Sequence, residues 1–166
     1  MIAAIRDFFL RVVGRHLCVL FCAMIPVIEL RGSIPIGLAL EVPFWENLLL
    51  SILGNMIPVP LVLLLIRWIL VGMSHVKGLR VISDWLYKKA EKNKPTIDKY
   101  GYIGLCLLVA IPLPGTGAWT GSLVASIFHM DFKKSLLAIF IGVLIAAAIV
   151  SFITYGGVAL FRALFS

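Results

Sequence analysis

The chain has 166 residues, of which 61% are hydrophobic and only 14% are charged. Soluble domains carry roughly 25% charged residues, so this composition excludes a water-soluble domain. A bilayer core of about 30 Å needs about 20 apolar helical residues. Stretches without Asp, Glu, Lys or Arg reach or pass that length at residues 47–66, 100–128 and 135–161. We therefore expect one all-α integral membrane domain over residues 1–166, multi-pass, in the inner (cell) membrane.

Residues 1–15 carry Arg6, Arg11 and Arg15 ahead of an apolar run, a shape shared with signal peptides. No A-x-A-like cleavage site follows, and apolar residues recur at helical spacing within this stretch. We expect an amphipathic helix that lies in the membrane interface.

Residues 73–99 form a basic stretch between two apolar halves, residues 16–72 and residues 100–166. Much of the net charge of +7 is concentrated there. Positive residues beside membrane segments mark the cytoplasmic side, so we expect a cytoplasmic loop. An apolar stripe within it predicts a second interfacial helix whose lysines face anionic headgroups. The expected partners are membrane lipids and not nucleic acid.

The two halves resemble each other, which predicts an internal repeat. The aligned pairs are Ile25-Pro26 with Ile111-Pro112, Leu38-Ala39 with Val124-Ala125 and, after a two-residue slip, Phe44 with Phe132 and Gly54 with Gly142. Each half is predicted to hold an apolar segment broken by proline and glycine, followed by a long apolar helix.

Proline and glycine cluster in both broken segments. They are Pro26, Gly32, Pro35 and Gly37 in the first, and Pro112, Pro114, Gly115, Gly117 and Gly121 in the second. Proline removes a backbone donor and clashes with the preceding turn, and glycine weakens a helix, so we expect helical structure to be lost there. Non-helical backbone at membrane depth must be buried in protein or line a wet cavity. Paired broken segments therefore point to a transport site.

Two topologies are open. Each broken segment can be a re-entrant hairpin, which gives inverted repeats, or it can cross fully, which gives four spans and parallel repeats. The half-segments have about a dozen residues each, little more than half of what spans a bilayer. We favour inverted repeats whose hairpins face each other across a cavity. A homodimer is also considered, because so short a chain makes a thin wall around a cavity.

Glu29 and Arg31 lie inside the first broken segment. A charge at bilayer depth is costly, so such residues are usually paired or functional. One interpretation is a mutual ion pair, or an arginine that binds carbonyl groups of the broken backbone. The other is a substrate site, including Gly32 and Pro35, in which Arg31 binds an anion and Glu29 carries a proton.

The second break, IPLPGTGAWTG from Ile111, contains no charge. Gly-rich turns that lead into helices bind anions through backbone N–H groups, so we expect this loop to line the same site. Its candidate binding residues are Pro112, Pro114, Gly115, Thr116, Gly117, Trp119 and Thr120. Trp119 has packing as an alternative role.

The sequence contains no Ser-His-Asp arrangement that points to catalysis, no Walker loop and no HExxH motif. An enzyme is the weaker class, and we expect no metal and no cofactor. Cys18, Cys22 and Cys106 all lie in apolar runs and are predicted to be small buried hydrophobes.

The stretches ELRGSIPIG from Glu29 and IPLPGTGAWTG from Ile111 resemble the two signature stretches of the family named small multi-drug export protein. That family looks like a distant relative of the DedA, or VTT-domain, superfamily, whose members have two facing re-entrant loops. Members are implicated in moving phospholipids or polyprenyl phosphates, often with proton coupling. The resemblance implies that Glu29 is the acidic residue of the first motif, and that Pro112, Pro114 and Gly115 form a Pro-x-Pro-Gly turn. Thr116 stands where DedA proteins have a carboxylate, and the second loop lacks their arginines, which weakens phosphate binding there.

Together these patterns predict a small secondary transporter or lipid scramblase. It would move an anionic amphiphile, such as a polyprenyl phosphate or a phospholipid, through the cavity between the two breaks, with proton coupling through Glu29. Two alternatives stay open. One is a proton-coupled exporter of cationic compounds, with Glu29 as the ligand and Arg31 as its partner. The other is a structural subunit of a membrane complex.

Overall fold

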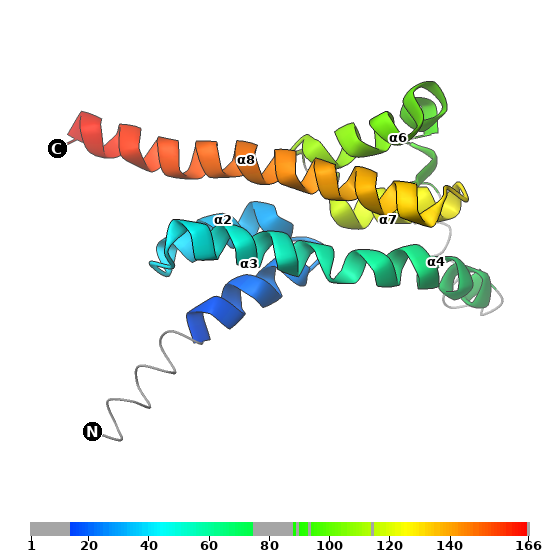
Figure 1. The fold of residues 1–166 in the computed structure, drawn as a ribbon, viewed down its shortest axis with the longest axis horizontal. Coiled ribbons are helices and arrows are strands. Elements are labelled where there is room, and N and C mark those ends of the chain that lie inside the picture. Colours follow the sequence, from blue (N-terminus) through cyan, green and yellow to red (C-terminus); the bar gives the residue numbers. More distant parts are fainter. Residues whose placement is uncertain (1–13, 75–87, 89, 93, 114, 166) are drawn as a thin grey trace, which may run out of the picture. The chain divides into compact units, whose positions relative to one another are not determined.

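The computed structural model describes residues 14–74, 88, 90–92, 94–113 and 115–165, and the regular structure within these ranges is α-helical. The helices in chain order are Gly14–Met24, α2 (Glu29–Ala39), α3 (Phe44–Met56), α4 (Pro58–Ser74), α6 (Lys94–Ala110), α7 (Ala118–Ile127) and α8 (Phe132–Phe165) (Figure 1). The interfacial helix predicted over residues 1–15 falls outside the described residues except for its last two. Much of the basic loop predicted over residues 73–99 also falls outside them.

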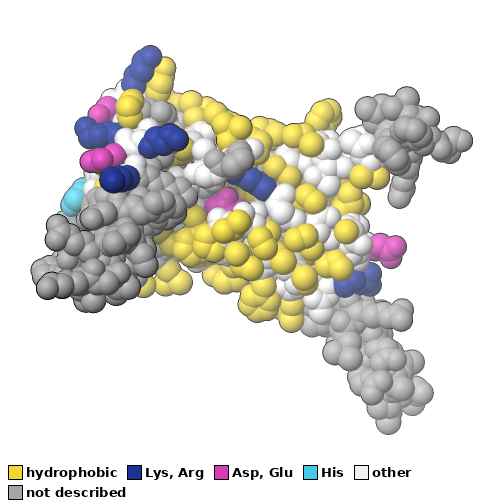
Figure 2. Space-filling view, turned by 180° about the vertical axis from the view of Figure 1, so that it is seen from behind, with side chains coloured by type: hydrophobic (Ala, Val, Ile, Leu, Met, Phe, Trp, Pro, Cys, Tyr) yellow, Lys and Arg dark blue, Asp and Glu magenta, His cyan; other side chains and the backbone are white. Residues whose placement is uncertain are grey.

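Two stretches are long and apolar enough to cross a membrane, Phe44–Ile66 and Phe132–Ala159. Only 28% of the most apolar part of the first and 44% of the second is buried, and Phe152 is 81% exposed. Apolar side chains cover much of the face shown in Figure 2. A soluble protein would bury side chains of this kind in its core, so the outward apolar surface is that of a membrane protein.

The chain divides into two compact units, Met1–Asn55 with Ile145–Ser166, and Met56–Leu144. The first unit holds the helix Gly14–Met24, α2, α3 and the C-terminal part of α8. The second unit holds α4, α6, α7 and the N-terminal part of α8. Each unit therefore combines one broken segment and the helix start that follows it with part of a long helix from the other half of the sequence.

An Ile-Pro pair follows the end of a helix in both halves. The helix Gly14–Met24 ends directly before Ile25, and α6 ends directly before Ile111. Residues 25–28 and the described part of residues 111–117 are non-helical, and α2 and α7 follow them. Proline cannot donate the backbone hydrogen bond that would continue the helix. The interruptions at Pro26 and Pro112 thus lie where the sequence predicts them.

Gly32, Pro35 and Gly37 do not break α2, contrary to the prediction from sequence. Pro35 lies within the helix with its ring exposed, a position that membrane helices tolerate because neighbouring groups re-satisfy the backbone. Gly37 serves close packing, since a Cβ there would lie 2.0 Å from the side-chain oxygen of Asn47. Gly121 likewise lies within α7 against Val109. Small residues at such contacts let helices approach each other closely.

A residue with positive φ ends each short helix, Glu41 (φ 57°) after α2 and His129 (φ 56°) after α7. Each donates its N–H to the carbonyl three residues earlier, and the next residue donates to the carbonyl five residues earlier, which is the Schellman motif. The bonds are Glu41 to Leu38 (3.0 Å), Val42 to Gly37 (2.9 Å), His129 to Ser126 (3.3 Å) and Met130 to Ala125 (3.0 Å). The same cap therefore recurs from position 41 to position 129.

The long helices that follow also make matching contacts through a glycine. A Cβ at Gly54 of α3 would meet the backbone of the helix Gly14–Met24. A Cβ at Gly142 of α8 would meet the backbone of α6. The distances are 2.4 Å from Gly54 to the Leu20 carbonyl oxygen and 2.7 Å from Gly142 to the Cys106 carbonyl oxygen. Glu41 and His129 are separated by the same number of residues as Gly54 and Gly142. Under the predicted repeat, this common spacing places the two-residue slip before the ends of α2 and α7, whereas the alignment of the sequence placed it after Leu38-Ala39.

Candidate functional site

Glu29 is the first residue of α2 and directly follows the break at residues 25–28. The residue is only 4% exposed. Its backbone has φ 51°, a left-handed conformation that costs a non-glycine residue on the order of 1–3 kcal/mol. Strained backbone and membrane-depth carboxylates both concentrate at functional positions. Glu29 combines burial with a strained backbone, which makes it the strongest candidate residue of the first break.

Arg31 lies two residues after Glu29 on α2 and is half-buried. The opposite charges of the two side chains attract each other. In surroundings of low dielectric constant, this attraction offsets part of the cost of removing both groups from water. The structure thus brings the two predicted charges together at one helix start.

Gly32 and Pro35 continue α2 beyond this pair. The Gly32 N–H donates to the Ile28 carbonyl at 3.0 Å, which closes the first helical turn over the break. Pro35 is exposed one turn after Arg31. Gly32 and Pro35 thus lie on the same helix as Glu29 and Arg31. Their role in substrate binding stays a prediction.

The second break has a backbone path that depends on glycine. Gly115 has φ 85° and Gly117 has φ 123°, conformations that residues with a Cβ rarely adopt. Gly117 is the N-cap of α7, and its carbonyl accepts a hydrogen bond of 2.8 Å from the Gly121 N–H. Pro112 is half-buried, and Pro114 lies outside the described residues.

Thr116 and Thr120 use their hydroxyl groups inside this loop. Thr116 Oγ1 lies 2.8 Å from the carbonyl oxygens of both Ile111 and Leu113. Thr120 Oγ1 donates to the Gly115 carbonyl at 3.0 Å. These bonds satisfy carbonyl groups that an interrupted helix leaves without helical partners. A hydroxyl has one hydrogen to donate, so in this conformation both threonines can meet a ligand only as acceptors.

Trp119 is half-buried on the first turn of α7. Glu29, Arg31, Gly32 and Pro35 belong to the first compact unit, and the described candidate residues of the second break belong to the second. The common cavity between the two breaks therefore stays a prediction. Within the described ranges, no group of three or more His, Cys, Asp or Glu residues could hold a metal ion.

A buried polar cluster lies beside α2, and sequence reasoning missed the role of Asn47 in it. Asn47 Nδ2 donates to the Ile34 carbonyl at 2.8 Å and to the Tyr155 hydroxyl at 2.9 Å. The Ser51 hydroxyl donates to Asn47 Oδ1 at 3.4 Å, and the Ser33 hydroxyl donates to Ser51 at 2.7 Å. This cluster fixes α2 against α3 and α8. The available signal was the spacing of Asn47 and Ser51 by one helical turn within an apolar helix.

A family model described as "Putative small multi-drug export protein" matches residues 29–149. This chain belongs to that family. The match starts at Glu29, includes Arg31 and the second break, and continues into α8. The description names an export function, and exporters are transporters, which are not a class of enzyme. No curated protein and no solved structure matches the chain.

Proposed function

We propose that the protein is a proton-coupled exporter of cationic amphiphilic compounds, in which Glu29 binds the proton and the substrate in turn. The observation that carries this proposal is the Glu29 carboxylate, almost fully buried at the strained start of α2. An ionised carboxylate away from water is costly. A proton or an organic cation bound to it lowers that cost. The family description, an exporter of drugs, supports the same substrate class.

A single carboxylate couples two fluxes because its two ligands exclude each other. A cationic substrate needs the ionised carboxylate, whereas a proton neutralises it. Binding of one ligand therefore weakens binding of the other by the same factor. Arg31, which attracts the same carboxylate, competes with the substrate and keeps it from binding too tightly to leave.

Alternating access to Glu29 requires an architecture that opens to each side, and we propose inverted repeats of re-entrant hairpins. The matching Schellman motifs after α2 and α7 support a repeated unit, as do the matching contacts of Gly54 and Gly142. The two short helices have 11 and 10 residues. They therefore rise about 15 Å each, roughly half of the hydrocarbon core, which supports hairpins that turn back within the membrane.

The test uses purified protein in liposomes with an imposed pH gradient and tetraphenylphosphonium as the cation. The wild-type protein is expected to accumulate the cation against its own gradient, and Glu29→Gln is expected to show only background accumulation. Glu41→Gln is the matched control, because Glu41 is an exposed glutamate at the other end of α2. Wild-type accumulation by Glu29→Gln would remove Glu29 from the mechanism.

A second candidate function is the movement of an anionic amphiphile, a polyprenyl phosphate or a phospholipid, bound by Arg31. The observation that favours it is accessibility, since Arg31 is half-buried whereas Glu29 is buried. The resemblance to DedA proteins points to the same substrates. This candidate predicts that fluorescent phosphatidylglycerol crosses liposome membranes containing the wild-type protein, and that Arg31→Gln stops it. Cation accumulation would then be absent from the wild-type protein.

A further inference from the structure

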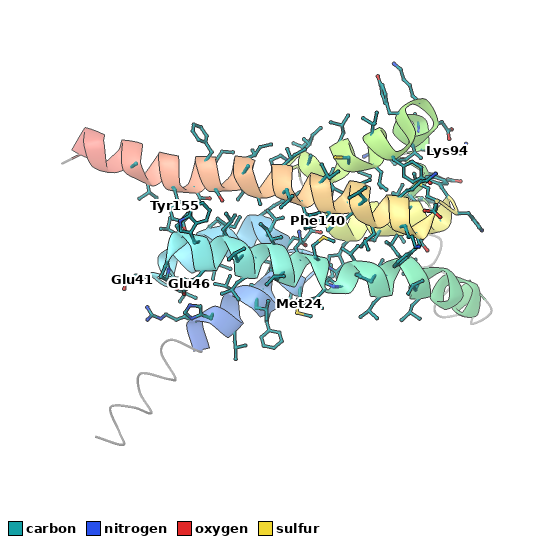
Figure 3. All side chains as sticks on the ribbon, in the orientation of Figure 1. Met24, Glu41, Glu46, Lys94, Phe140 and Tyr155 are labelled. Carbon is teal, nitrogen blue, oxygen red and sulfur yellow. The ribbon has the colours of Figure 1, made fainter. Side chains whose placement is uncertain are left out.

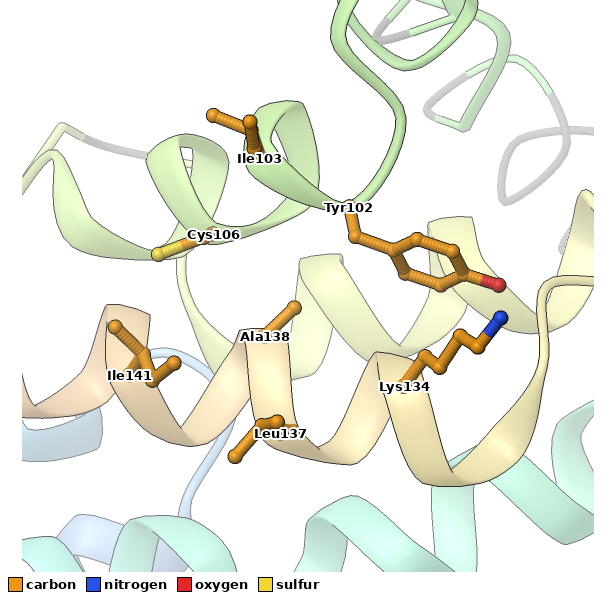
Figure 4. Close-up of a pocket in the computed structure, with 7 residues that line it drawn as sticks. All are labelled: Tyr102, Ile103, Cys106, Lys134, Leu137, Ala138 and Ile141. Atoms are coloured by element: carbon orange, nitrogen blue, oxygen red, sulfur yellow. The ribbon is translucent and has the colours of Figure 1, made fainter.

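An apolar groove opens between α6 and α8 within the unit Met56–Leu144. Its volume is about 360 Å³, within the range of small-molecule sites in proteins. Its apolar walls are formed chiefly by Ile103, Cys106, Leu137 and Ile141, and Tyr102 and Lys134 stand together at one end (Figure 4). Ile103 is 69% and Leu137 is 60% exposed, so the groove is open along an apolar outer surface.

The polar end of the groove is built from the start of α8 and the residue after the kink in α6. The Lys134 ammonium lies 5.9 Å from the centre of the Tyr102 ring, a cation–π distance. The Tyr102 hydroxyl accepts a hydrogen bond of 3.2 Å from the Asp131 N–H. A phenol that accepts one hydrogen bond keeps its own hydrogen to donate. Lys134 and Tyr102 thus present a positive charge and a donor at the same place.

Gly101 holds Tyr102 in this position. It has φ 54° and ψ −126° and interrupts the helical backbone of α6. A Cβ at Gly101 would meet nothing within 4 Å, so the backbone conformation, and not lack of space, requires glycine there. The kink separates the exposed, charged start of α6 from its apolar part, as expected at a membrane surface.

The charges at the start of α8 indicate what the groove binds. Lys133 and Lys134 stand in the first turn of α8, where the helix macrodipole disfavours cations and favours anions. Asp131 already caps this helix, because its carboxylate accepts the Lys134 N–H at 3.0 Å. A further anion beside Lys134 would offset the unfavourable placement of the lysines. Charge complementarity therefore selects an anionic occupant.

We propose that this groove binds an anionic phospholipid, with one acyl chain along the apolar walls and the phosphate at Lys134 and Tyr102. A lipid is the occupant because the apolar walls of the groove are open at the apolar outer surface, and its cationic end lies in the first turn of α8. Neither feature involves Glu29 or Arg31, so the lipid site is independent of the proposed export function.

Native mass spectrometry of the full-length protein in detergent tests this site, with palmitoyl-oleoyl phosphatidylglycerol and the matching phosphatidylcholine as probes. The wild-type protein is expected to bind phosphatidylglycerol more tightly. One lysine near an anionic lipid corresponds to about a fivefold change in affinity, so Lys134→Gln should remove about that much of the preference. Lys133→Gln is the matched control, with the same loss of charge one residue outside the groove, and should keep the preference.

A second variant tests the groove itself. Leu137→Trp places a bulky side chain at an exposed wall position and is expected to weaken binding of both lipids, while the protein still elutes as a single species on gel filtration. Equal wild-type binding of the two lipids would overturn the proposal. So would equal losses in Lys133→Gln and Lys134→Gln, or wild-type binding of both lipids by Leu137→Trp.

Discussion

The side-chain amide of Asn47 donates a hydrogen bond of 2.9 Å to the hydroxyl of Tyr155. Phe44, the first residue of α3, packs edge-on against the Tyr155 ring with the ring centres 4.9 Å apart. These contacts join the start of α3 to the C-terminal part of α8, about 35 Å along that helix from its first residue, Phe132. The inverted repeats proposed above require the two long helices to start at opposite membrane surfaces.

Cysteine labelling tests this topology at two matched positions. Trp45 and Lys133 each follow the first residue of a long helix, and both are exposed. In a background without the native cysteines, we expect Trp45→Cys and Lys133→Cys to react with an impermeant thiol reagent from opposite sides of the membrane. Labelling of both from the same side would contradict inverted repeats and favour four full spans.

The contact between Gly37 and Asn47 predicts a coupled effect on stability. Gly37→Ala is expected to destabilise the protein by about 1–3 kcal/mol, as overpacking does, because the new Cβ would collide with the Asn47 side chain. In the double variant with Asn47→Ala, the collision disappears, so the two losses should be less than additive. Thermal unfolding in detergent measures both effects. Gly156→Ala is the control, since a Cβ there meets nothing within 4 Å.

These residues also show how far the sequence alone can lead. The two Ile-Pro interruptions followed from the missing proline donor, a local property. Gly32, Pro35 and Gly37 looked like further breaks because local preference disfavours helix at each. Instead α2 continues through all three, because packing against α3 outweighs the local preference. The role of Gly37 becomes visible only once Asn47 is placed against it.

The polar cluster illustrates the same limit. The spacing of Asn47 and Ser51 could be read from the sequence, but the bond from Asn47 to Tyr155 joins residues more than a hundred positions apart. A hydrogen bond of that kind depends on tertiary packing, and periodicity does not reveal it. For Glu29 and Arg31, in contrast, the cost of charge in an apolar segment was enough to single them out.

Glu41 is expected to be replaceable by glycine with a gain in stability. It holds the left-handed position of the Schellman motif after α2, where glycine has no Cβ penalty. Glu41→Gly should raise the free energy of unfolding by about 1 kcal/mol and leave transport unchanged. Thermal unfolding and cation accumulation check the two parts. A loss of stability would show that the Glu41 side chain contributes more than its backbone strain costs.

Glu29→Gly separates backbone strain from chemistry at the proposed site. Because Glu29 also has positive φ, glycine relieves strain there, and we expect Glu29→Gly to be at least as stable as Glu29→Gln. Both variants should lack cation accumulation, since neither carries a carboxylate. A Glu29→Gly protein that unfolds at a lower temperature than Glu29→Gln would indicate that the residue at position 29 has chiefly a packing role.

Thr116 is expected to support the second break through its hydroxyl. Thr116→Val removes the donor that lies 2.8 Å from two loop carbonyls and should destabilise the protein by about 1–3 kcal/mol. Thr116→Ser keeps the hydroxyl and should stay close to wild type. A wild-type unfolding temperature for Thr116→Val, or a fall in Thr116→Ser as large as that in Thr116→Val, would contradict a supporting role of the hydroxyl.

The central claim, that a proton and a cation share Glu29, is tested most directly by proton release on substrate binding. Tetraphenylphosphonium is added to the purified protein in weakly buffered detergent solution, and the change in pH is recorded with a dye. Because the two ligands exclude each other at one carboxylate, binding to the protonated wild-type protein should release protons, and Glu29→Gln should release none. Equal proton release by Glu29→Gln and the wild-type protein would contradict this account.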